Sequence, residues 1–381
     1  MNILKFIEKF FGYGPITEKI VAIFSLFGSF SFFRILLTPV NKRIFVSCGL
    51  PSYISNINSV LTSLHKEGYR IFIFPEWLKD SNLDAQLREV MSGCFLICNN
   101  SSRILPLFES FVFLSSVSGK HYYFPRKTPR YYYFHSVAGL DGFVKGGFDS
   151  YHVFLTATIQ QYDELIERFQ SEKKFGKRVL KVGYPKLDDL RKRVADVSTV
   201  YSHDKPKVLY APTYSNDTIY KNLSSLPKSV EIIESLLSSG FSVVFRPHPL
   251  SIRHGLNRVL FENIKKRFST FDFVFDTSVD YFNSYLDSCI MVTDVSGTAI
   301  TYRYAFDKPV IFYCEDHSLA QQALSGIEIL GPLVAETNKL SIEIISCLEL
   351  NDRVATTESY VFNLDNSKSI FLNAIMDHRL N

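Results

Sequence analysis

The sequence predicts an α/β protein built from two doubly wound, Rossmann-like domains. Apolar runs of strand length alternate with segments of helical spacing, and this alternation occurs twice along the chain. The strand candidates are continuously apolar, which is typical of parallel strands buried on both faces. The chain has 381 residues, 46% of them hydrophobic and 21% charged, so it is long enough and apolar enough for two globular domains.

The first half of the chain begins with a strand–helix–strand unit. Its three segments are residues 43–50, 52–68 and 69–77. The helix stops at Gly68, a usual C-terminal residue for a helix. Further strands are expected at 130–136, 151–158 and 178–185, with a helix at 160–170. This order predicts a parallel sheet with crossover helices.

A domain boundary is expected at residues 191–206, which are polar and lack an apolar stripe. The alternation then resumes. Strands are expected at 207–214, 241–249, 272–278, 289–297 and 308–316, and helices at 229–240, 280–288 and 298–307. We therefore predict an N-terminal domain at 41–195 and a C-terminal domain at 205–381.

Residues 1–40 are predicted to form an amphipathic segment that associates with a membrane. The segment is aromatic and apolar, but its uncharged run from Ile20 to Phe33 has only fourteen residues, and a spanning helix needs about 20. The run also ends in a poor signal-peptidase site. Helices lying among anionic headgroups fit the pattern, and a pair of helices packed on the protein body is the alternative.

The positive charge of the chain is concentrated in the same segment. Residues 1–45 contain six basic and two acidic residues, an excess equal to the net charge of +4 of the whole chain. A nucleic-acid-binding protein would usually carry a basic face on its folded body. We therefore expect no nucleic-acid partner.

The cysteines indicate a reducing compartment. They are scattered, mostly in or beside apolar runs, which is typical of buried thiols. Cys94 and Cys98 have no second Cys or His pair at zinc-site spacing.

The stretch "VVFRPHPLS", residues 243–251, places two ionisable residues directly after a buried strand. Arg246 and His248 each precede a proline, which restricts them to extended conformations. Alternation along an extended chain would point both side chains the same way. They are candidates for contacts with phosphate oxygens, and a surface turn is the alternative.

The stretch "CIMVTDVSGTAITY" has the composition of an anion site between a strand and a helix. Hydroxyl groups, a glycine and the amides of a helix start favour a bound phosphate, because a helix N-terminus carries about half a positive charge. An ordinary Ser or Thr helix cap is the alternative. The candidates for donor and phosphate binding here are Asp294, Ser296, Gly297 and Thr298, and Pro212 and Thr213 join them from the preceding strand end "YAPTY".

A third candidate is His135, which ends the strand in "YYYFHSVAGLDGFVKGG". Four glycines follow it within twelve residues, too many for a packing element, and this favours a catalytic histidine over a structural one. Ser136 and Lys145 in the same stretch are candidates for the acceptor side. No dinucleotide fingerprint, P-loop, serine elbow or His-Glu-x-x-His motif is present, and we expect neither a metal nor another cofactor.

Together these stretches resemble the CDP-glycerol glycerophosphotransferase family, which makes teichoic-acid-like and capsular polymers. The resemblance covers roughly residues 130–315 through "FHS…KGGFDSYHVFLTAT", "VGYPKLDDL", "VLYAPTY", "FRPHP" and "VTDVSGTAITYRYAFDKPVIFY". It implies a GT-B fold, peripheral attachment to the cytoplasmic face of the membrane, a base at His135, and pyrophosphate contacts from His248 and Ser296. The sequence departs from the family at the first histidine, with Phe-His-Ser, and at the turn "DVSGT".

The expected activity is transfer of an alditol phosphate from a CDP-linked donor to a hydroxyl of a polysaccharide or lipid-linked acceptor, with release of CMP. The N-terminal domain would hold the acceptor and the C-terminal domain the donor, with His135 and His248 as catalytic residues. A nucleotide-sugar glycosyltransferase is the first alternative. A sugar-nucleotide epimerase and a catalytically silent membrane-bound assembly protein are the others.

Overall fold

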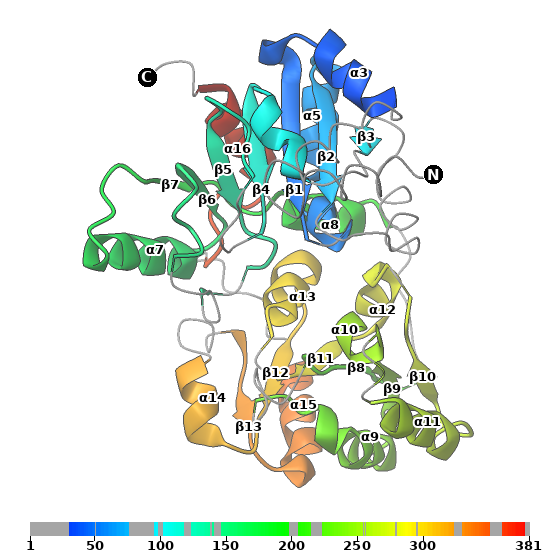
Figure 1. The fold of residues 1–381 in the computed structure, drawn as a ribbon. Coiled ribbons are helices and arrows are strands. Elements are labelled where there is room, and N and C mark those ends of the chain that lie inside the picture. The colour runs from blue at the N-terminus through cyan, green and yellow to red at the C-terminus, as the bar shows by residue number, and fades with distance from the viewer. Residues whose placement is uncertain are drawn as a thin grey trace, which may run out of the picture. The chain divides into compact units, whose positions relative to one another are not determined.

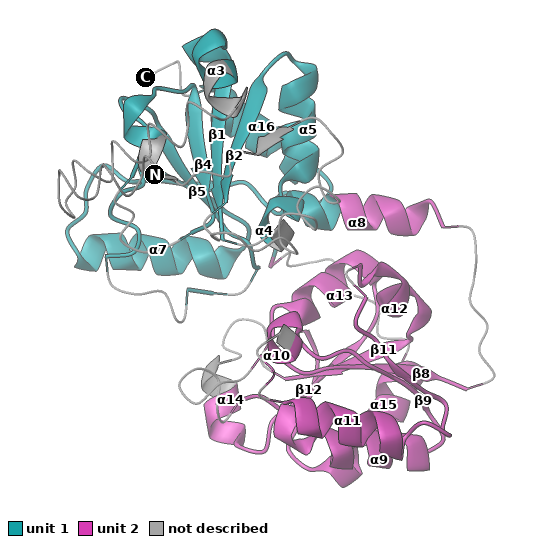
Figure 2. Ribbon diagram, turned by 45° about the vertical axis from the view of Figure 1, so that its right-hand side comes forward, with its two compact units in different colours: residues 1–188, 361–381 teal, residues 189–360 magenta. Residues whose placement is uncertain are grey.

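The computed structural model describes most of the chain. The described residues are 30–49, 51–75, 95–97, 102–117, 123–137, 139–140, 146–197, 205–214, 223–253, 255, 257–278, 280–294, 296–323, 330–350 and 360–377. The chain divides into two compact units, with Met1–Asp188 and Val361–Asn381 in unit 1 and Asp189–Tyr360 in unit 2 (Figure 2). The division falls inside helix α8 (Pro185–Ala195), a few residues before the polar stretch at 191–206.

Unit 1 contains a parallel sheet of seven strands in the order β3-β2-β1-β4-β5-β6-β7. Its strands are β1 (Arg43–Cys48), β2 (Arg70–Pro75), β3 (Phe95–Ile97), β4 (Val112–Ser115), β5 (Arg130–Tyr133), β6 (Val153–Thr156) and β7 (Arg178–Lys181). All pairings within it are parallel. The first strand lies inside the sheet, with β2 on one side and β4 on the other, which is the doubly wound order.

Helices cover both faces of this sheet (Figure 1). On one face, α5 (Asn58–Lys66) and α16 (Ser367–Met376) bury Leu61 and Phe371 against β1, β4 and β5. On the other, α7 (Ile159–Ser171) packs with α3 (Phe30–Leu37) against an aromatic layer that includes Phe45 and Tyr132. A short helix, α4 (Pro51–Ser55), precedes α5, so the helix expected at 52–68 is two helices.

Unit 2 repeats the architecture with a parallel sheet of six strands in the order β10-β9-β8-β11-β12-β13. Its strands are β8 (Lys207–Ala211), β9 (Ser242–Phe245), β10 (Phe273–Phe275), β11 (Ile290–Thr293), β12 (Val310–Tyr313) and β13 (Leu333–Val334). Its helices are α9 (Ser229–Ser238), α10 (Pro249–Arg253), α11 (Arg258–Arg267), α12 (Phe282–Asp287), α13 (Thr298–Phe306), α14 (His317–Ala323) and α15 (Leu340–Glu349). The first strand, β8, is again internal, and the predicted pair of doubly wound domains is confirmed.

The C-terminal end of the chain belongs to unit 1, although the sequence placed residues 205–381 in one domain. Val361 pairs with Thr158 in an antiparallel bridge, and α16 then packs beside α5. The Asp188 carboxylate accepts hydrogen bonds from the backbone N–H groups of Asp365 and Lys368 at the start of α16. Helical spacing alone cannot tell on which sheet a helix will pack, so this return was not predictable.

The N-terminal helix α3 packs on unit 1 through Ile35. Ile35 is fully buried, and the Arg43 guanidinium donates to the backbone oxygens of Thr38 and Leu36. The next two residues are exposed, Leu36 by 52% and Leu37 by 82%. Residues 1–29 of the predicted membrane segment lie outside the described residues. Within the described part of the chain, no helix has the length and apolar character needed to cross a membrane.

Substitution of Gly183 tests how closely the C-terminal segment, residues 361–377, packs on unit 1. Its φ of +96° favours glycine, and an added Cβ would lie 2.3 Å from the Phe362 carbonyl oxygen. Gly176 is a matched control, since it has a φ of +89° and nothing within 4 Å of an added Cβ. Gly176→Ala should lower the free energy of unfolding by about 1 kcal/mol, the cost of the backbone conformation.

Gly183→Ala should lower the free energy of unfolding by roughly 3 kcal/mol or more, because the backbone of residues 361–367 must also move. Urea denaturation of the two variants and the wild type measures the difference. Equal losses in both variants would show that the close approach of Phe362 does not stabilise the fold.

Candidate functional site

The candidate donor groups of unit 2 follow three neighbouring strands. His248 follows β9, Thr213 follows β8, and Ser296 follows β11. Because the sheet is parallel, these residues lie at its carboxyl edge, around the point where the strand order changes direction between β8 and β11. This is the place where doubly wound sheets bind ligands.

His248 is held at this edge by its own backbone neighbours. Its Nδ1 accepts a hydrogen bond from the Leu250 N–H at 3.2 Å, at the start of α10. This bond leaves the ring proton on Nε2, which can donate to a ligand. Burial lowers the pKa of His248 to about 4, so the imidazole is neutral near pH 7. His248 is therefore a neutral hydrogen-bond donor that is partly shielded from water.

Arg246 has protein partners in the structure. Its Nη1 donates to the Asp276 carboxylate at 2.5 Å, and its Nη2 donates to the Ser278 carbonyl at 2.7 Å. Asp276 and Ser278 follow β10, on one side of β9, whereas the His248 ring faces Tyr214 in the loop after β8, on the other side. The two side chains therefore contact groups that follow different neighbouring strands.

Asp294 is also engaged by the protein. Its carboxylate is fully buried and accepts from the backbone N–H of Thr213 at 2.9 Å and from the N–H and hydroxyl of Ser225 at 2.7 and 2.8 Å. Burial raises its pKa to about 6, and these hydrogen bonds act in the opposite direction. Asp294 thus ties the "YAPTY" loop, which contains Pro212 and Thr213, to the end of β11.

The predicted anion site lies at the start of α13. Ser296, Gly297 and Thr298 are partly exposed, and the first turn of α13 contains no acidic residue. The Thr298 N–H points to the Ser296 hydroxyl at 3.4 Å, and the Thr298 hydroxyl bonds with the Tyr285 hydroxyl. The first turn of α13 thus places no negative side-chain charge at the positive end of the helix, which favours an anion there.

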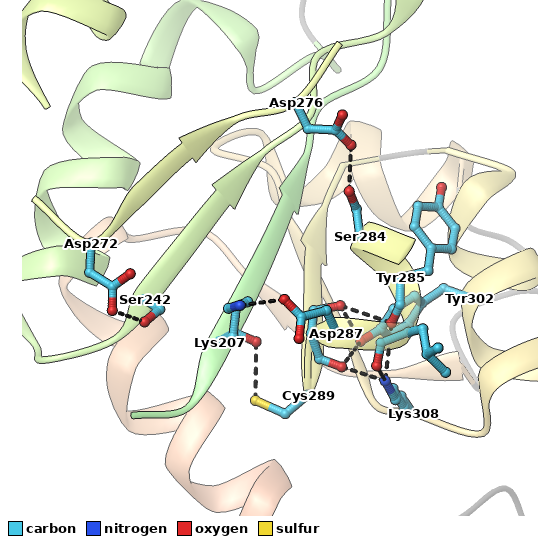
Figure 3. Close-up of polar contacts among 12 residues, drawn as sticks. Lys207, Ser242, Asp272, Asp276, Ser284, Tyr285, Asp287, Cys289, Tyr302 and Lys308 are labelled. Carbon is cyan, nitrogen blue, oxygen red and sulfur yellow. Dashed lines mark hydrogen bonds and ion pairs between the residues drawn. The ribbon is translucent and has the colours of Figure 1, made fainter. Parts of the chain in front are cut away.

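Helix α12 makes hydrogen bonds with groups at this edge, and Figure 3 shows its contacts with Asp276 and Lys308. Its Ser284 donates to Asp276, the partner of Arg246, and its Tyr285 bonds with Thr298. The Lys308 ammonium donates to the carbonyl oxygens of Tyr285, Leu286 and Ser288, where α12 ends. Burial lowers the pKa of Lys308 to about 8. Sequence analysis did not identify α12 or Lys308 as support for the site, because these contacts join residues that no motif links in the sequence.

The candidate base, His135, lies at the carboxyl edge of the sheet of unit 1, just after β5. Its carbonyl oxygen accepts from Asn56 Nδ2 at 2.9 Å and from the Tyr184 hydroxyl at 3.1 Å. Its ring is stacked on Tyr53, with centroids 3.9 Å apart and planes 17° apart. Burial lowers the pKa of His135 to about 4, and an interaction with the Ser116 backbone opposes this shift.

The segment after His135 is anchored by α7. The Ser136 carbonyl accepts from Gln161 Nε2 at 2.8 Å, and the Leu140 N–H donates to the Glu164 carboxylate. The acceptor-side role of Ser136 stays a prediction. Lys145, the other acceptor-side candidate, lies outside the described residues.

Comparison with known proteins identifies the family. The CDP-Glycerol:Poly(glycerophosphate) glycerophosphotransferase family matches residues 150–363, more than half of the chain. The chain belongs to this family. It is therefore a transferase of the glycerophosphotransferase type, and the match includes every candidate residue of unit 2. His135 precedes the matched residues, so its role rests on the structure of unit 1 and on the resemblance of the sequence around it.

Solved structures show the same fold over nearly the whole chain. The wall teichoic acid polymerase TagF is 16% identical with a TM-score of 0.58, and the alignment covers 95% of this chain and 97% of that one. A UDP-GlcNAc 2-epimerase from Neisseria meningitidis is 14% identical with a TM-score of 0.60, covering 88% and 100%. A glycosyltransferase from Rickettsia africae ESF-5 is 15% identical with a TM-score of 0.54, covering 88% and 99%. The predicted GT-B-like fold is confirmed. No curated protein matches the sequence.

The ion pair of Arg246 should contribute to stability. Burial acts to raise the pKa of Asp276, but the hydrogen bonds from Ser278 and Ser284 and the charge of Arg246 outweigh it, so the pKa lies below its ordinary value of 3.8. The stability that this carboxylate contributes is therefore present above that value and is lost as the pH falls through the lowered one. Arg246→Met should lower the free energy of unfolding by about 3 kcal/mol at pH 7, because it leaves a carboxylate only 9% exposed without its cation.

Arg267→Met is the matched control for this prediction. Arg267 pairs with Glu234 on the surface, where the two side chains are 47% and 52% exposed, so its loss should cost less than about 1 kcal/mol. The double variant Arg246→Met/Asp276→Leu should be more stable than Arg246→Met alone, as measured by urea denaturation. A double variant that is no more stable would show that the pair is not the source of the loss.

Proposed function

We propose that the protein transfers an alditol phosphate, glycerol phosphate in the first instance, from a CDP-linked donor to a hydroxyl group of a glycan or polyol-phosphate acceptor. The observation that carries the proposal is the family match over residues 150–363, which spans the carboxyl edge of unit 2. Three features of that edge support a bound pyrophosphate: a neutral imidazole N–H, hydroxyl groups and a first turn of α13 without acidic side chains.

The donor would bind to unit 2 through its phosphates. His248 Nε2 would donate to a phosphate oxygen, and Ser296 and the backbone amides of Gly297 and Thr298 would receive the other oxygens. Such preformed donors stabilise the negative charge that moves to the leaving phosphate during transfer. Asp294 and α12 would position these groups without contacting the donor.

The base would be His135 of unit 1. An imidazole with a pKa of about 4 has a free lone pair near pH 7, so it can accept a proton without first losing one. In the proposed step the acceptor oxygen forms a bond to the β-phosphorus, and its proton passes to His135. The bond from the β-phosphorus to the bridging oxygen breaks, and CMP leaves with both electrons of that bond.

Donor identity is tested by incubating the full chain with CDP-glycerol, CDP-ribitol and UDP-sugars and measuring nucleotide release. CMP release that requires an acceptor supports the proposal. UDP release from a nucleotide sugar would instead support the alternative glycosyltransferase, in which attack falls on the sugar carbon.

The two histidines should have separable effects. His135→Ala should lower turnover by about 10²- to 10⁴-fold with CDP affinity unchanged, because it removes the base. His248→Ala should weaken CDP binding by roughly ten- to a hundredfold, the worth of a hydrogen bond to a charged group, while cytidine binding changes less than about threefold. Turnover assays and calorimetric titration of CDP and cytidine measure both effects.

His248→Asn is the control for the structural role of His248. Its amide oxygen can replace Nδ1 as the acceptor for Leu250 N–H, so α10 keeps its start while the outer N–H is lost. It should bind CDP as weakly as His248→Ala and melt like the wild type. Normal CDP affinity in His248→Asn would remove His248 from the phosphate site.

We further propose that the protein attaches reversibly to an anionic membrane surface through its N-terminal segment, on the cytoplasmic side. The excess positive charge of the chain lies in residues 1–45, and α3 presents Leu36 and Leu37 to solvent. Apolar side chains beside basic residues favour the headgroup region of anionic lipid.

Deleting residues 1–29 should leave the fold intact, because Ile35 and the Arg43 contacts with residues 36–38 remain. The shortened protein should no longer sediment with vesicles containing phosphatidylserine. Replacing Lys5, Lys9 and Lys19 with glutamine should make the free energy of vesicle binding less favourable by about 1 kcal/mol per lysine, as measured by sedimentation. Undiminished sedimentation of the shortened protein would place the binding surface elsewhere.

A further inference from the structure

The imidazole of His135 is covered by an aromatic ring from a distant part of the chain. Tyr53 belongs to α4, which follows β1, whereas His135 follows β5. The two rings are nearly parallel with centroids 3.9 Å apart, which is contact distance for stacked rings. One face of the imidazole is therefore protected from water.

The position of Tyr53 is itself fixed by the strand before it. An added Cβ at Gly49 would lie 3.4 Å from Cε2 of the Tyr53 ring and 3.7 Å from Cγ2 of Val117. The ring thus lies close to the backbone where β1 ends. Tyr53 reaches His135 from the short helix α4, close after the central strand β1.

Among the described residues, no charged side chain acts on the pKa of His135. Its neighbours with titratable side chains are Tyr53 on α4, Tyr133 on β5 and Tyr184 before α8, and burial raises the pKa of all three. Ser116, after β4, contributes its backbone, and Asn56 and Tyr184 bind the His135 carbonyl oxygen. Nδ1 of His135 is buried and makes no hydrogen bond of normal geometry with the described residues. In the described part of the chain, ring stacking and backbone contacts orient the imidazole, without a charged partner.

We propose that Tyr53 is a positioning residue for transfer, whose ring holds the plane of the His135 imidazole and keeps one face of it dry. The inference rests on the proposed role of His135 as base. Catalytic histidines are often oriented by a carboxylate, but a carboxylate beside the base would repel the phosphates of the donor. A stacked ring can orient the imidazole and leave its lone pair available without adding a negative charge. A small rotation of the imidazole would move the lone pair away from the acceptor hydroxyl, and such misplacement can cost about a hundredfold in rate.

The first test is independent of activity. The titration of His135 is followed by NMR in protein labelled at histidine, with its resonance identified by its loss in His135→Ala. Tyr53→Leu should raise the pKa of His135 by about one to two units, because water reaches the exposed face and desolvation is the main cause of its low value. Tyr53→Phe keeps the ring and should titrate like the wild type.

The second test is the pH profile of transfer. Tyr53→Leu should lower kcat about ten- to a hundredfold and move its acidic limb to higher pH, with the KM for donor unchanged. Tyr53→Phe should stay within about threefold of the wild type with the same limb. If Tyr53→Leu does not fold, Tyr53→Met replaces it, since its flexible side chain fills space without stacking.

Tyr69→Leu is the control for a lost aromatic ring. Tyr69 packs on Phe111 just before β2, at the amino edge of the same sheet, opposite His135. Tyr69→Leu should lower the melting temperature and leave both the titration of His135 and the acidic limb of the pH profile unchanged.

If Tyr53→Leu titrates like the wild type, the inference is overturned even when transfer is confirmed. If the titration shifts but the wild type releases no CMP from CDP-linked donors, Tyr53 still orients His135 and the proposed function fails.

Discussion

The internal position of the first strand in each sheet is the constraint on which the site depends. β1 pairs with β2 on one side and β4 on the other, and β8 pairs in the same way with β9 and β11. In each sheet, the chain therefore runs from the first strand toward one edge and later returns to build the other edge. The loops that follow the two strands at this switch point diverge and leave space at the carboxyl edge. His248, Thr213 and Ser296 come from strands that meet at this edge, and so do Tyr53 and His135 in unit 1.

Carboxylates that are buried or partly buried link the loops at these edges. Asp294 joins two loops of unit 2, Asp276 binds Arg246 after β9, and Asp188 binds the start of α16 in unit 1. Each accepts several hydrogen bonds from backbone or hydroxyl donors, as a carboxylate removed from water must. Asp294 and Asp276 thus hold together loops that follow neighbouring strands of unit 2.

The two candidate histidines have the same protonation state for the same physical reason. Burial lowers the pKa of each to about 4, and no acidic side chain offsets it. A neutral imidazole can either accept a proton or donate a hydrogen bond, and its surroundings select between these roles. The Leu250 N–H occupies Nδ1 of His248 and so makes it a donor, whereas His135 is held by stacking and keeps a lone pair available.

The sequence by itself determined the fold class, the alternation of strands and helices, the family and the strand ends where candidate groups gather. These properties are local, since periodicity and turn residues act over a few positions. Only the tertiary structure decided that Arg246 binds Asp276, that Tyr53 covers His135, and that α16 returns to unit 1. Arg246 and Asp276 follow neighbouring strands, whereas Tyr53 and His135 follow β1 and β5, on either side of β4. Each of these contacts joins residues far apart in the chain, and the order of the strands and the packing of helices on the sheet decide which of them meet.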